Sequence, residues 1–406
     1  MKHAPVYLHA LGMINALGAD IDAIAAALGR GADAALAARP VAQGAAVAGI
    51  AGTAAALAPF AGQVAALLDL APPAALAHYD CRNNRLLLAA LAQVAPAVEA
   101  AVARHGPGRV GVVIGTSTSG IEAAEQAFAR RAAEGAMPPG FDYRQMEIGT
   151  AAPFVRAALG LAGPAYTLST ACTSSAKAFA AARRLLRLGI CDAVVVGGAD
   201  SRCELTTQGF ASLESVSPER TNPMSRHRRG INIGEGAAVF VMGRDEGEIR
   251  LAGAGESSDA HHISAPDPQG HGARLALDEA LADAGVTATQ IGYVNLHATA
   301  TQHNDAMEAR VMARVFPDGV PASGTKPMTG HLLGAAGATE LAFAWLTLAR
   351  DLALPVHVWD GEADPALPPL DLVQGTRRLG GDARGRYVMS NSFAFGGSNA
   401  SLILGR

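Results

Sequence analysis

The chain has few aromatic and charged side chains: of its 406 residues, 5% are aromatic and 17% are charged. Half of the residues are hydrophobic, which excludes an intrinsically disordered chain. The 32 basic and 36 acidic residues leave a net charge of −4, so there is no overall basic surface for nucleic acid. An acidic partner would need a local basic patch.

Cysteine is scarce as well. The four cysteines, Cys81, Cys172, Cys191 and Cys203, lie far apart without a CxxC pair, which excludes a disulfide framework and a zinc ribbon. We therefore expect a reduced, cytoplasmic setting.

A strongly hydrophobic membrane span is also missing. His3, His9 and Asn15 interrupt the N-terminal apolar run, so no signal peptide is expected. The uncharged stretch between Arg39 and Asp69 is long enough to cross a bilayer, but it consists chiefly of alanine and glycine. We predict a soluble protein without membrane insertion.

Alanine and glycine are abundant instead, with 46 glycines in the chain, a composition that suits helices packed closely against sheets. Short apolar runs without alternation predict strands covered on both faces, at residues 110–114, 165–168, 193–196, 237–242, 249–253, 291–296 and 387–389. Helices are expected over residues 173–188, 274–284 and 333–349. The second half of the chain repeats the plan of the first, which indicates an α/β duplication with halves 1–245 and 246–406.

Cys172 lies in the segment TACTSS, between an expected strand and an expected helix. A helix N-terminus lowers the pKa of a thiol from ~8.5 towards neutrality, which would make Cys172 a nucleophile. The alternative is a buried structural cysteine, and this is our interpretation of Cys81, Cys191 and Cys203.

His297 and His331 also occupy strand-to-helix junctions, where α/β folds gather their sites. Either histidine alone could simply satisfy a hydrogen bond, but together with Cys172 they indicate an active site. Asp305 and Glu308 follow His297 and either cap a helix or support that site.

Evidence for other ligands is weak. His261 and His262 with Asp259 have no third ligand at a suitable spacing, so we expect a solvated loop and no metal. The segment NSFAFGGSN at residues 391–399 contains a Gly-Gly turn whose free backbone N–H groups could stabilise an oxyanion.

These motifs together resemble the β-ketoacyl-acyl carrier protein synthases of the elongating type. The resemblance covers nearly the whole chain and rests on TACTSS, GINIGEGA from residue 230, His297 with Asn304-Asp305, TKPMTGHLLGAAGA and NSFAFGGSN, in family order. It implies the thiolase fold, a five-layered α-β-α-β-α arrangement of two pseudo-symmetric halves, usually as a homodimer. It also implies decarboxylative condensation of malonyl-carrier with an acyl thioester, without a tightly bound cofactor.

The resemblance implies that Cys172 accepts the acyl chain from the phosphopantetheine of acyl carrier protein. The backbone N–H groups of Cys172 and Phe395 would form the oxyanion hole, and Phe393 and Phe395 would gate the acyl pocket. His297 and His331 would bind the malonyl thioester carbonyl.

Lys326, paired with Glu340, would organise the site. Two histidines, rather than a histidine and an asparagine, distinguish this type from the initiating synthases. A degradative thiolase would need a second catalytic cysteine near the C-terminus, yet none follows Cys203.

Several positions depart from the family pattern. Ala298, Ala300 and Gln302 stand where glycines and a proline are usual, and Ala394 replaces a glycine that lets the gate move. With the segment 222–232, they suggest a specialised polyketide or aryl polyene synthase in place of a housekeeping enzyme.

Three questions stay open on sequence alone. The chain could be a partner subunit of the chain-length-factor type in which Cys172 is little used, or it could act on coenzyme A thioesters. The dimer could be formed with a sister ketosynthase. A basic patch for the acidic carrier could include Arg130 and Arg131, with Arg82 and Arg85, or these could simply be a solvated helix face.

Overall fold

The computed structural model describes residues 4–36, 60–64, 70–380 and 386–406. Most of the uncharged stretch between Arg39 and Asp69 lies outside these residues.

The strands follow one hydrogen-bonded order, β3-β2-β4-β5-β1-β6-β10-β9-β7-β8. The first half contributes β1 (Tyr7–Ile14), β2 (Val110–Gly115), β3 (Ala165–Leu168), β4 (Ala193–Asp200) and β5 (Gly236–Gly243). The second half contributes β6 (Arg250–Ser258), β7 (Ile291–Asn295), β8 (Ala322–Ser323), β9 (Tyr387–Ala394) and β10 (Ser398–Gly405).

The two halves have the same topology. From either outer edge, the order is the third, second, fourth, fifth and first strand of that half. The directions also match, because β2 is parallel to β3 and β4 just as β7 is parallel to β8 and β9, and the remaining pairs within each half are antiparallel. The halves join where Tyr7 of β1 pairs with Arg250 of β6. The predicted duplication is therefore confirmed.

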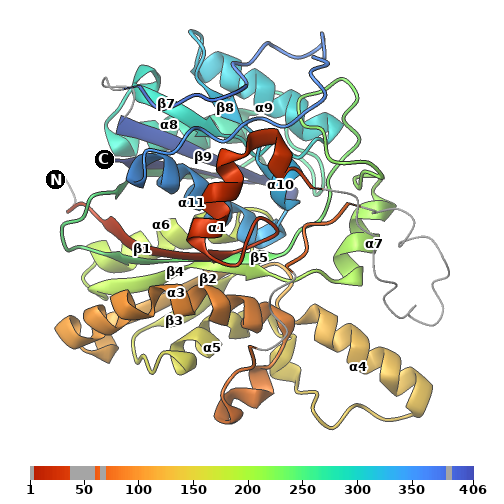
Figure 1. Ribbon diagram of the computed structural model, residues 1–406, viewed down its shortest axis with the longest axis vertical. Helices are drawn as coiled ribbons and strands as arrows, with labels where there is room; N and C mark the ends of the chain where they lie inside the picture. The colour runs from red at the N-terminus through yellow and green to blue at the C-terminus, as the bar shows by residue number, and fades with distance from the viewer. Residues whose placement is uncertain (1–3, 37–59, 65–69, 381–385) are drawn as a thin grey trace.

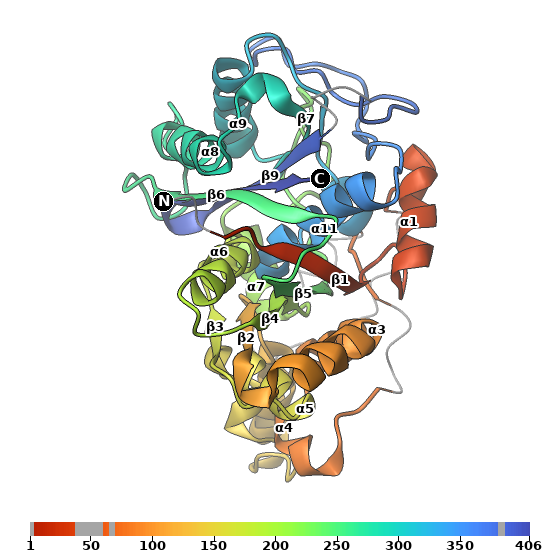
Figure 2. The ribbon, with the colours of Figure 1, turned by 90° about the vertical axis from the view of Figure 1, so that its left-hand side faces the viewer.

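Helices and sheets alternate in five layers (Figures 1 and 2). The five strands of each half form one layer, and we call these layers the first and the second sheet. The outer face of the first sheet is covered by α3 (Arg82–His105) and α5 (Ala151–Ala158). Between the sheets lie α6 (Ser174–Arg187) and α11 (Ala336–Ala349), and the other outer layer consists of α8 (His271–Ala284) and α9 (Gln302–Val315). The remaining α-helices discussed below are α4 (Ile121–Glu134), α7 (Glu204–Ser212) and α10 (Lys326–Thr329).

The excess of small residues is explained by the central layer. A Cβ on Gly337 of α11 would lie 2.8 Å from the Cβ of Ala176 on α6, so the two central helices approach more closely than larger side chains allow. Around this contact, Phe179, Phe240 and Phe343 form an apolar core that reaches both sheets.

The predicted strands and helices all coincide with observed elements, whereas several others were not predicted, among them β1, β10, α3, α4, α5, α7 and α9. By length and composition α3 could cross a membrane. Its buried side chains, including Leu86, Leu91 and Val98, belong instead to the core beneath the first sheet, so α3 is a core helix.

Candidate active site

Cys172 lies in the turn that joins β3 to α6. The turn is strained, because Ala171 has a left-handed φ of 51° although it carries a Cβ. The carbonyl of Ala171 accepts hydrogen bonds from Ser174 N at 3.0 Å and from Ser174 Oγ at 2.6 Å. These bonds hold the thiol immediately before α6.

The predicted lowering of the Cys172 pKa was wrong. Burial raises the pKa of this thiol to about 12, and only the positive charge of Lys326 and a backbone hydrogen bond oppose the shift. Desolvation penalises the thiolate more strongly than the helix N-terminus favours it. Cys172 therefore rests as a neutral thiol and needs a base within reach.

His331 lies within reach of the thiol, because its Nε2 atom is 3.0 Å from Cys172 Sγ. Its backbone N–H donates to Asn232 O at 2.6 Å, which fixes the loop. Burial, followed by the charge of Lys326, lowers the pKa of His331 well below its usual value, so the imidazole is neutral. Within the part of the chain that the structure describes, His331 Nδ1 has no hydrogen-bond partner, so neither tautomer is locked.

His297 is held more firmly. The backbone N–H groups of His297 and Ala298 each donate to the carboxylate of Glu308 at 2.7 Å. Lys326 Nζ lies 3.5 Å from His297 Nδ1 and donates to His297 O. Burial, then Lys326, lowers the pKa of His297 well below its usual value. Since the ammonium can only donate, the proton of the neutral imidazole belongs on Nε2, facing the pocket.

Lys326 and Glu340 form a buried ion pair of 2.5 Å between α10 and α11. Burial raises the pKa of the Glu340 carboxyl to about 7, against the effect of the lysine. The pair places a positive charge beside both histidines, which adds to the effect of burial in keeping them neutral.

Asp305 and Glu308 contact the histidine loop and do not cap α9, whose N-cap is Thr301. Asp305 accepts hydrogen bonds from Ala300 N at 3.1 Å and from Met224 N at 2.7 Å. Of the two alternatives open on sequence, this geometry corresponds to the supporting role.

Ala298 and Ala300 adopt left-handed φ angles of 41° and 61°, which glycine would adopt without strain. Each costs about 1–2 kcal/mol for a residue with a Cβ. Both methyl groups are buried, and the carboxylates of Glu308 and Asp305 bind the two N–H groups. The departure from the family pattern therefore keeps the glycine conformation.

The gate segment lies against the site. The ring of Phe393 is 6.0 Å from that of His297, and the ring of Phe395 is 5.4 Å from that of Phe210 on α7. Ala394 is extended, with a φ of −133°, so its Cβ causes no strain in this conformation. Phe210 was not singled out in the sequence.

One pocket brings the predicted residues together: Cys172, His297, His331, Phe393 and Phe395 all line it. The ligand atoms of Cys172, His297 and His331 lie within 4.8 Å of one another, a spacing that would also permit a metal ion. Arg130 and Arg131 do not line this pocket; they lie exposed on α4.

The remaining candidates lie elsewhere. His261 and His262 are exposed in a loop. Cys81, Cys191 and Cys203 are buried, and burial raises the pKa of each thiol. Sequence reasoning also missed Asp200, a fully buried carboxylate at the end of β4. Its only signal was a lone charge at the end of an apolar strand.

Two family descriptions match the chain. Residues 26–247 match the N-terminal domain of the β-ketoacyl synthases, and residues 249–358 match the C-terminal domain. The chain therefore belongs to the β-ketoacyl synthase family.

The chain is also similar to individual proteins with related names. The chain is 34% identical to 3-oxoacyl-[acyl-carrier-protein] synthase 2 of Vibrio cholerae over 73% of its own length and 76% of that protein. It is 42% identical to a solved chain from the ketosynthase ApeO in complex with its chain length factor ApeC from Xenorhabdus doucetiae, with a TM-score of 0.89 and coverage of 99% and 98%. The ishigamide ketosynthase/chain length factor is similar at 25% identity, with a TM-score of 0.83 and 99% of each chain covered.

The protein is thus an acyltransferase of the 3-oxoacyl-acyl carrier protein synthase class. Its reaction condenses an acyl thioester with a malonyl unit, with loss of carbon dioxide.

Proposed function

We propose that Cys172, His331 and His297 carry out this reaction in two stages, and the observation that carries the proposal is the 3.0 Å contact between Cys172 Sγ and His331 Nε2. In the first stage, Nε2 accepts the thiol proton as sulfur attacks the acyl thioester. The C–S bond to the carrier's phosphopantetheine breaks, and its thiolate leaves with the proton from His331. The N–H groups of Cys172 and Phe395 would stabilise the oxyanion.

In the second stage, malonyl-carrier enters the same pocket. His297 Nε2–H donates to the thioester oxygen, because Lys326 next to Nδ1 leaves this tautomer alone available. His331, whose tautomer is not locked, now donates from Nε2 to the same oxygen. As carbon dioxide leaves, the electrons of the breaking C–C bond form an enolate, whose carbon attacks the acyl group on Cys172. The C–S bond to Cys172 then breaks, and the released thiolate takes up a proton from water. No tightly bound cofactor is needed.

Loading of Cys172 tests this function. Intact-protein mass spectrometry after incubation with acyl-carrier should show one acyl adduct on the native protein and none on Cys172→Ala. If the native protein carries no acyl adduct after incubation, the result would contradict the proposal and favour a partner subunit of the chain-length-factor type. Equal loading from free acyl-coenzyme A would favour a coenzyme A-dependent enzyme.

We place the protein among specialised synthases that make polyketide or aryl polyene chains. Ala298, Ala300 and Ala394 support this, as does the higher identity to the ApeO–ApeC complex, 42%, than to the Vibrio cholerae synthase, 34%. A panel of saturated, polyunsaturated and aryl acyl-carriers, scored for loading, tests the class. Preferential loading of saturated chains would contradict it.

We propose that the protein works as a cytoplasmic dimer that pairs through β3. Within one chain, we place the boundary between the two halves at residues 245 and 246. Among the described residues β3 pairs on one side only, with β2, and its side chains are half-buried, so its other edge is available to a partner strand. The two similar ketosynthase/chain length factor complexes favour a sister subunit over a second copy. Light scattering of the chain alone and after co-expression with a sister subunit distinguishes the two.

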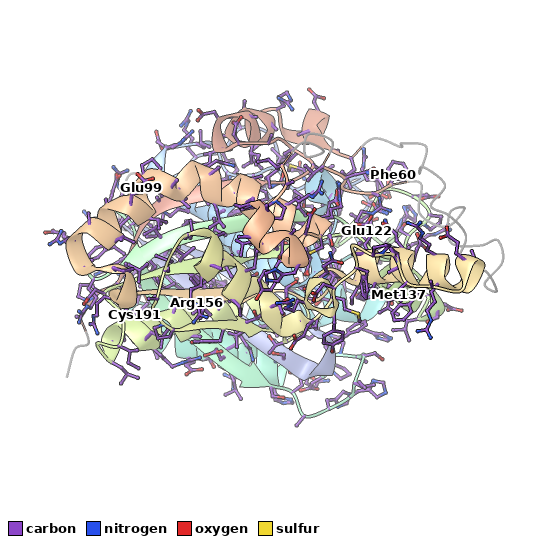
Figure 3. The ribbon with its side chains drawn as sticks, turned by 90° about the horizontal axis from the view of Figure 1, so that it is seen from below. Phe60, Glu99, Glu122, Met137, Arg156 and Cys191 are labelled. Carbon is purple, nitrogen blue, oxygen red and sulfur yellow. The ribbon has the colours of Figure 1, made fainter. Side chains whose placement is uncertain are left out.

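We propose that acyl carrier protein binds near the pocket mouth through exposed arginines. One candidate set is Arg130 and Arg131 on α4, a helix that projects from the body of the molecule (Figure 3). A second set, which we call the 220–229 cluster, consists of Arg220, Arg226 and Arg229. It lines a hollow together with Gln302, whose neighbour Thr301 lines the catalytic pocket.

Arg82 and Arg85 are weaker candidates, because their side chains are only 21% and 31% exposed, against 53% for Arg130. Charge reversal in either candidate set should raise KM for acyl-carrier while malonyl decarboxylation persists. Arg104→Glu is a matched control, since Arg104 is exposed in the last turn of α3 and lines neither the catalytic pocket nor the hollow. Unchanged carrier kinetics in both sets would contradict this docking surface.

A further inference from the structure

Asp200 is a fully buried carboxylate at the end of β4 that has no part in the two stages described above. Its Oδ1 atom accepts four hydrogen bonds from the turn that follows β2. The donors are Thr116 Oγ1 at 2.6 Å, Ser117 N at 2.8 Å, Thr118 N at 2.8 Å and Thr118 Oγ1 at 2.9 Å. We call these residues, with Asp200, the Asp200 cluster.

The Asp200 cluster contacts both sides of the reacting pair. Towards the nucleophile, Ser117 Oγ donates to the carbonyl of Ala171 at 3.2 Å, and Ala171 is the strained residue immediately before Cys172. Towards the base, Asp200 Oδ2 accepts from Ala335 N at 3.1 Å, four residues after His331. One carboxylate thus links the two loops whose side chains meet at 3.0 Å.

Space around the cluster is tight. A Cβ on Gly334 would lie 2.6 Å from Ser117 Oγ and 2.8 Å from Asp200 Oδ2. The loop after His331 therefore packs directly on the Asp200 cluster, and a shift of one moves the other.

We propose that Asp200 and Ser117 are positioning residues for acylation: they fix the strained peptide before Cys172 and the loop after His331 at the separation that proton transfer requires. The inference rests on the proposed roles of Cys172 and His331. Strained backbone persists at functional sites only where its surroundings hold it, and Ser117 is one of the groups that hold Ala171.

The charge of Asp200 has a second consequence. The charged or titratable groups that face the Cys172 thiol are Lys326, Asp200, Glu340, His297 and His331. Of these, Asp200 and Glu340 disfavour the thiolate. Asp200 therefore aligns the thiol for transfer to His331 and adds to the effect of burial, which is the main reason that the thiol stays protonated.

Two substitutions test this role. In Asp200→Asn the amide nitrogen would face the Ala335 N–H, donor against donor, so the link to the His331 loop is lost. We expect acylation of Cys172 to slow by roughly a hundredfold, since a displacement of about 1 Å can have that effect. Alkylation of Cys172 by iodoacetamide near neutral pH should become faster, by roughly tenfold, because loss of the negative charge lowers the thiol pKa.

Ser117→Ala removes only the bond to Ala171. Acylation should slow by roughly tenfold at an unchanged KM for the carrier, and the alkylation rate should stay within about twofold of the native rate. Thr118→Val is the matched control: it removes a hydroxyl bonded to the same carboxylate oxygen but no link to either loop, so acylation should change by less than about twofold.

Cys81, Cys191 and Cys203 report unfolding, since all three are buried and, unlike Cys172, do not line the catalytic pocket. They should stay unmodified in each variant while Cys172 reacts, which separates a local effect from loss of structure. If Asp200→Asn does not fold, the acylation rates of Ser117→Ala and Thr118→Val decide whether the bond from Ser117 to Ala171 positions Cys172.

Native acylation rates in Ser117→Ala, or slow acylation in Asp200→Asn without faster alkylation, would overturn the proposal. Failure of the native protein to acylate would instead contradict the proposed function.

Discussion

The two halves of the molecule share one strand order but carry different chemistry at equivalent strand ends. After β2 in the first half comes the turn at Ser117; after β7, its counterpart in the second half, comes His297. The segment after β3 contains Cys172, and the segment after β8 contains Lys326 and His331. The two halves thus share one scaffold, and the residues at its strand ends divide the proposed roles between a nucleophile and the groups that would stabilise the enolate.

The two halves also differ in the buried charged group that lies next to their candidate catalytic residues. Next to the thiol the first half places a buried carboxylate, Asp200, whereas next to the histidines the second half places a buried ammonium, Lys326. Burial is the main cause in both halves: it keeps the thiol protonated, with a smaller contribution from the carboxylate, and it keeps both imidazoles neutral, with a smaller contribution from the ammonium. Each half therefore holds its groups in the uncharged form that the next step needs.

Loss of the nucleophile should have the largest effect on activity and should separate the roles of the two halves most clearly. Cys172→Ala should abolish condensation, because no acyl group can be held, while the histidines continue to decarboxylate malonyl-carrier. Product analysis by mass spectrometry and release of labelled carbon dioxide measure the two activities. Residual condensation by this variant would contradict the division between the halves.

Substitution in the second half should have the converse effect. His297→Ala should slow malonyl decarboxylation by about 10²- to 10⁴-fold, the usual contribution of a positioned acid or base, while Cys172 still accepts an acyl group. His261→Ala, at an exposed histidine, is the control and should change neither activity. Loss of acylation in His297→Ala would mean that the two functions are not separate.

The two halves should also differ in their response to pH. Alkylation of Cys172 should rise about tenfold for each pH unit across the neutral and mildly alkaline range, because the thiol pKa lies near 12. Decarboxylation by Cys172→Ala should stay constant as the pH falls through about 6.5, since both imidazole pKa values lie well below that of a free histidine. A decline of decarboxylation by half near this pH would contradict the lowering of both imidazole pKa values by burial and by Lys326.

The smallest effect concerns the strained loop. Ala298→Gly relieves about 1–2 kcal/mol of left-handed strain but loses a buried methyl group, about 0.8 kcal/mol, and about 0.5–1 kcal/mol in chain entropy. We expect the free energy of unfolding to change by less than about 1 kcal/mol. Ala309→Gly, at a buried helical alanine of α9, has no strain to relieve and should lose about 1–2 kcal/mol. Denaturant unfolding measures both, and an equal loss would show that Ala298 is not strained.

Much of the fold could be predicted from the sequence, because short apolar runs are typical of strands buried on both faces, and the candidate catalytic residues lie where such runs end. The motifs around Cys172, His297 and His331 were sufficient to name the family. The pKa of Cys172 was predicted wrongly because sequence shows a helix start but does not show burial. Asp200 and Ser117 were missed because their contacts join segments far apart in the chain, which no local pattern reveals.

The most direct test of the division between the halves measures two activities on the same pair of variants. Cys172→Ala and His297→Ala are each incubated with acyl-carrier and with malonyl-carrier, and both the acyl adduct and carbon dioxide release are quantified. We predict no adduct with continued decarboxylation for Cys172→Ala, and a full adduct with decarboxylation reduced at least about a hundredfold for His297→Ala. Parallel loss of both activities in either variant would contradict the account.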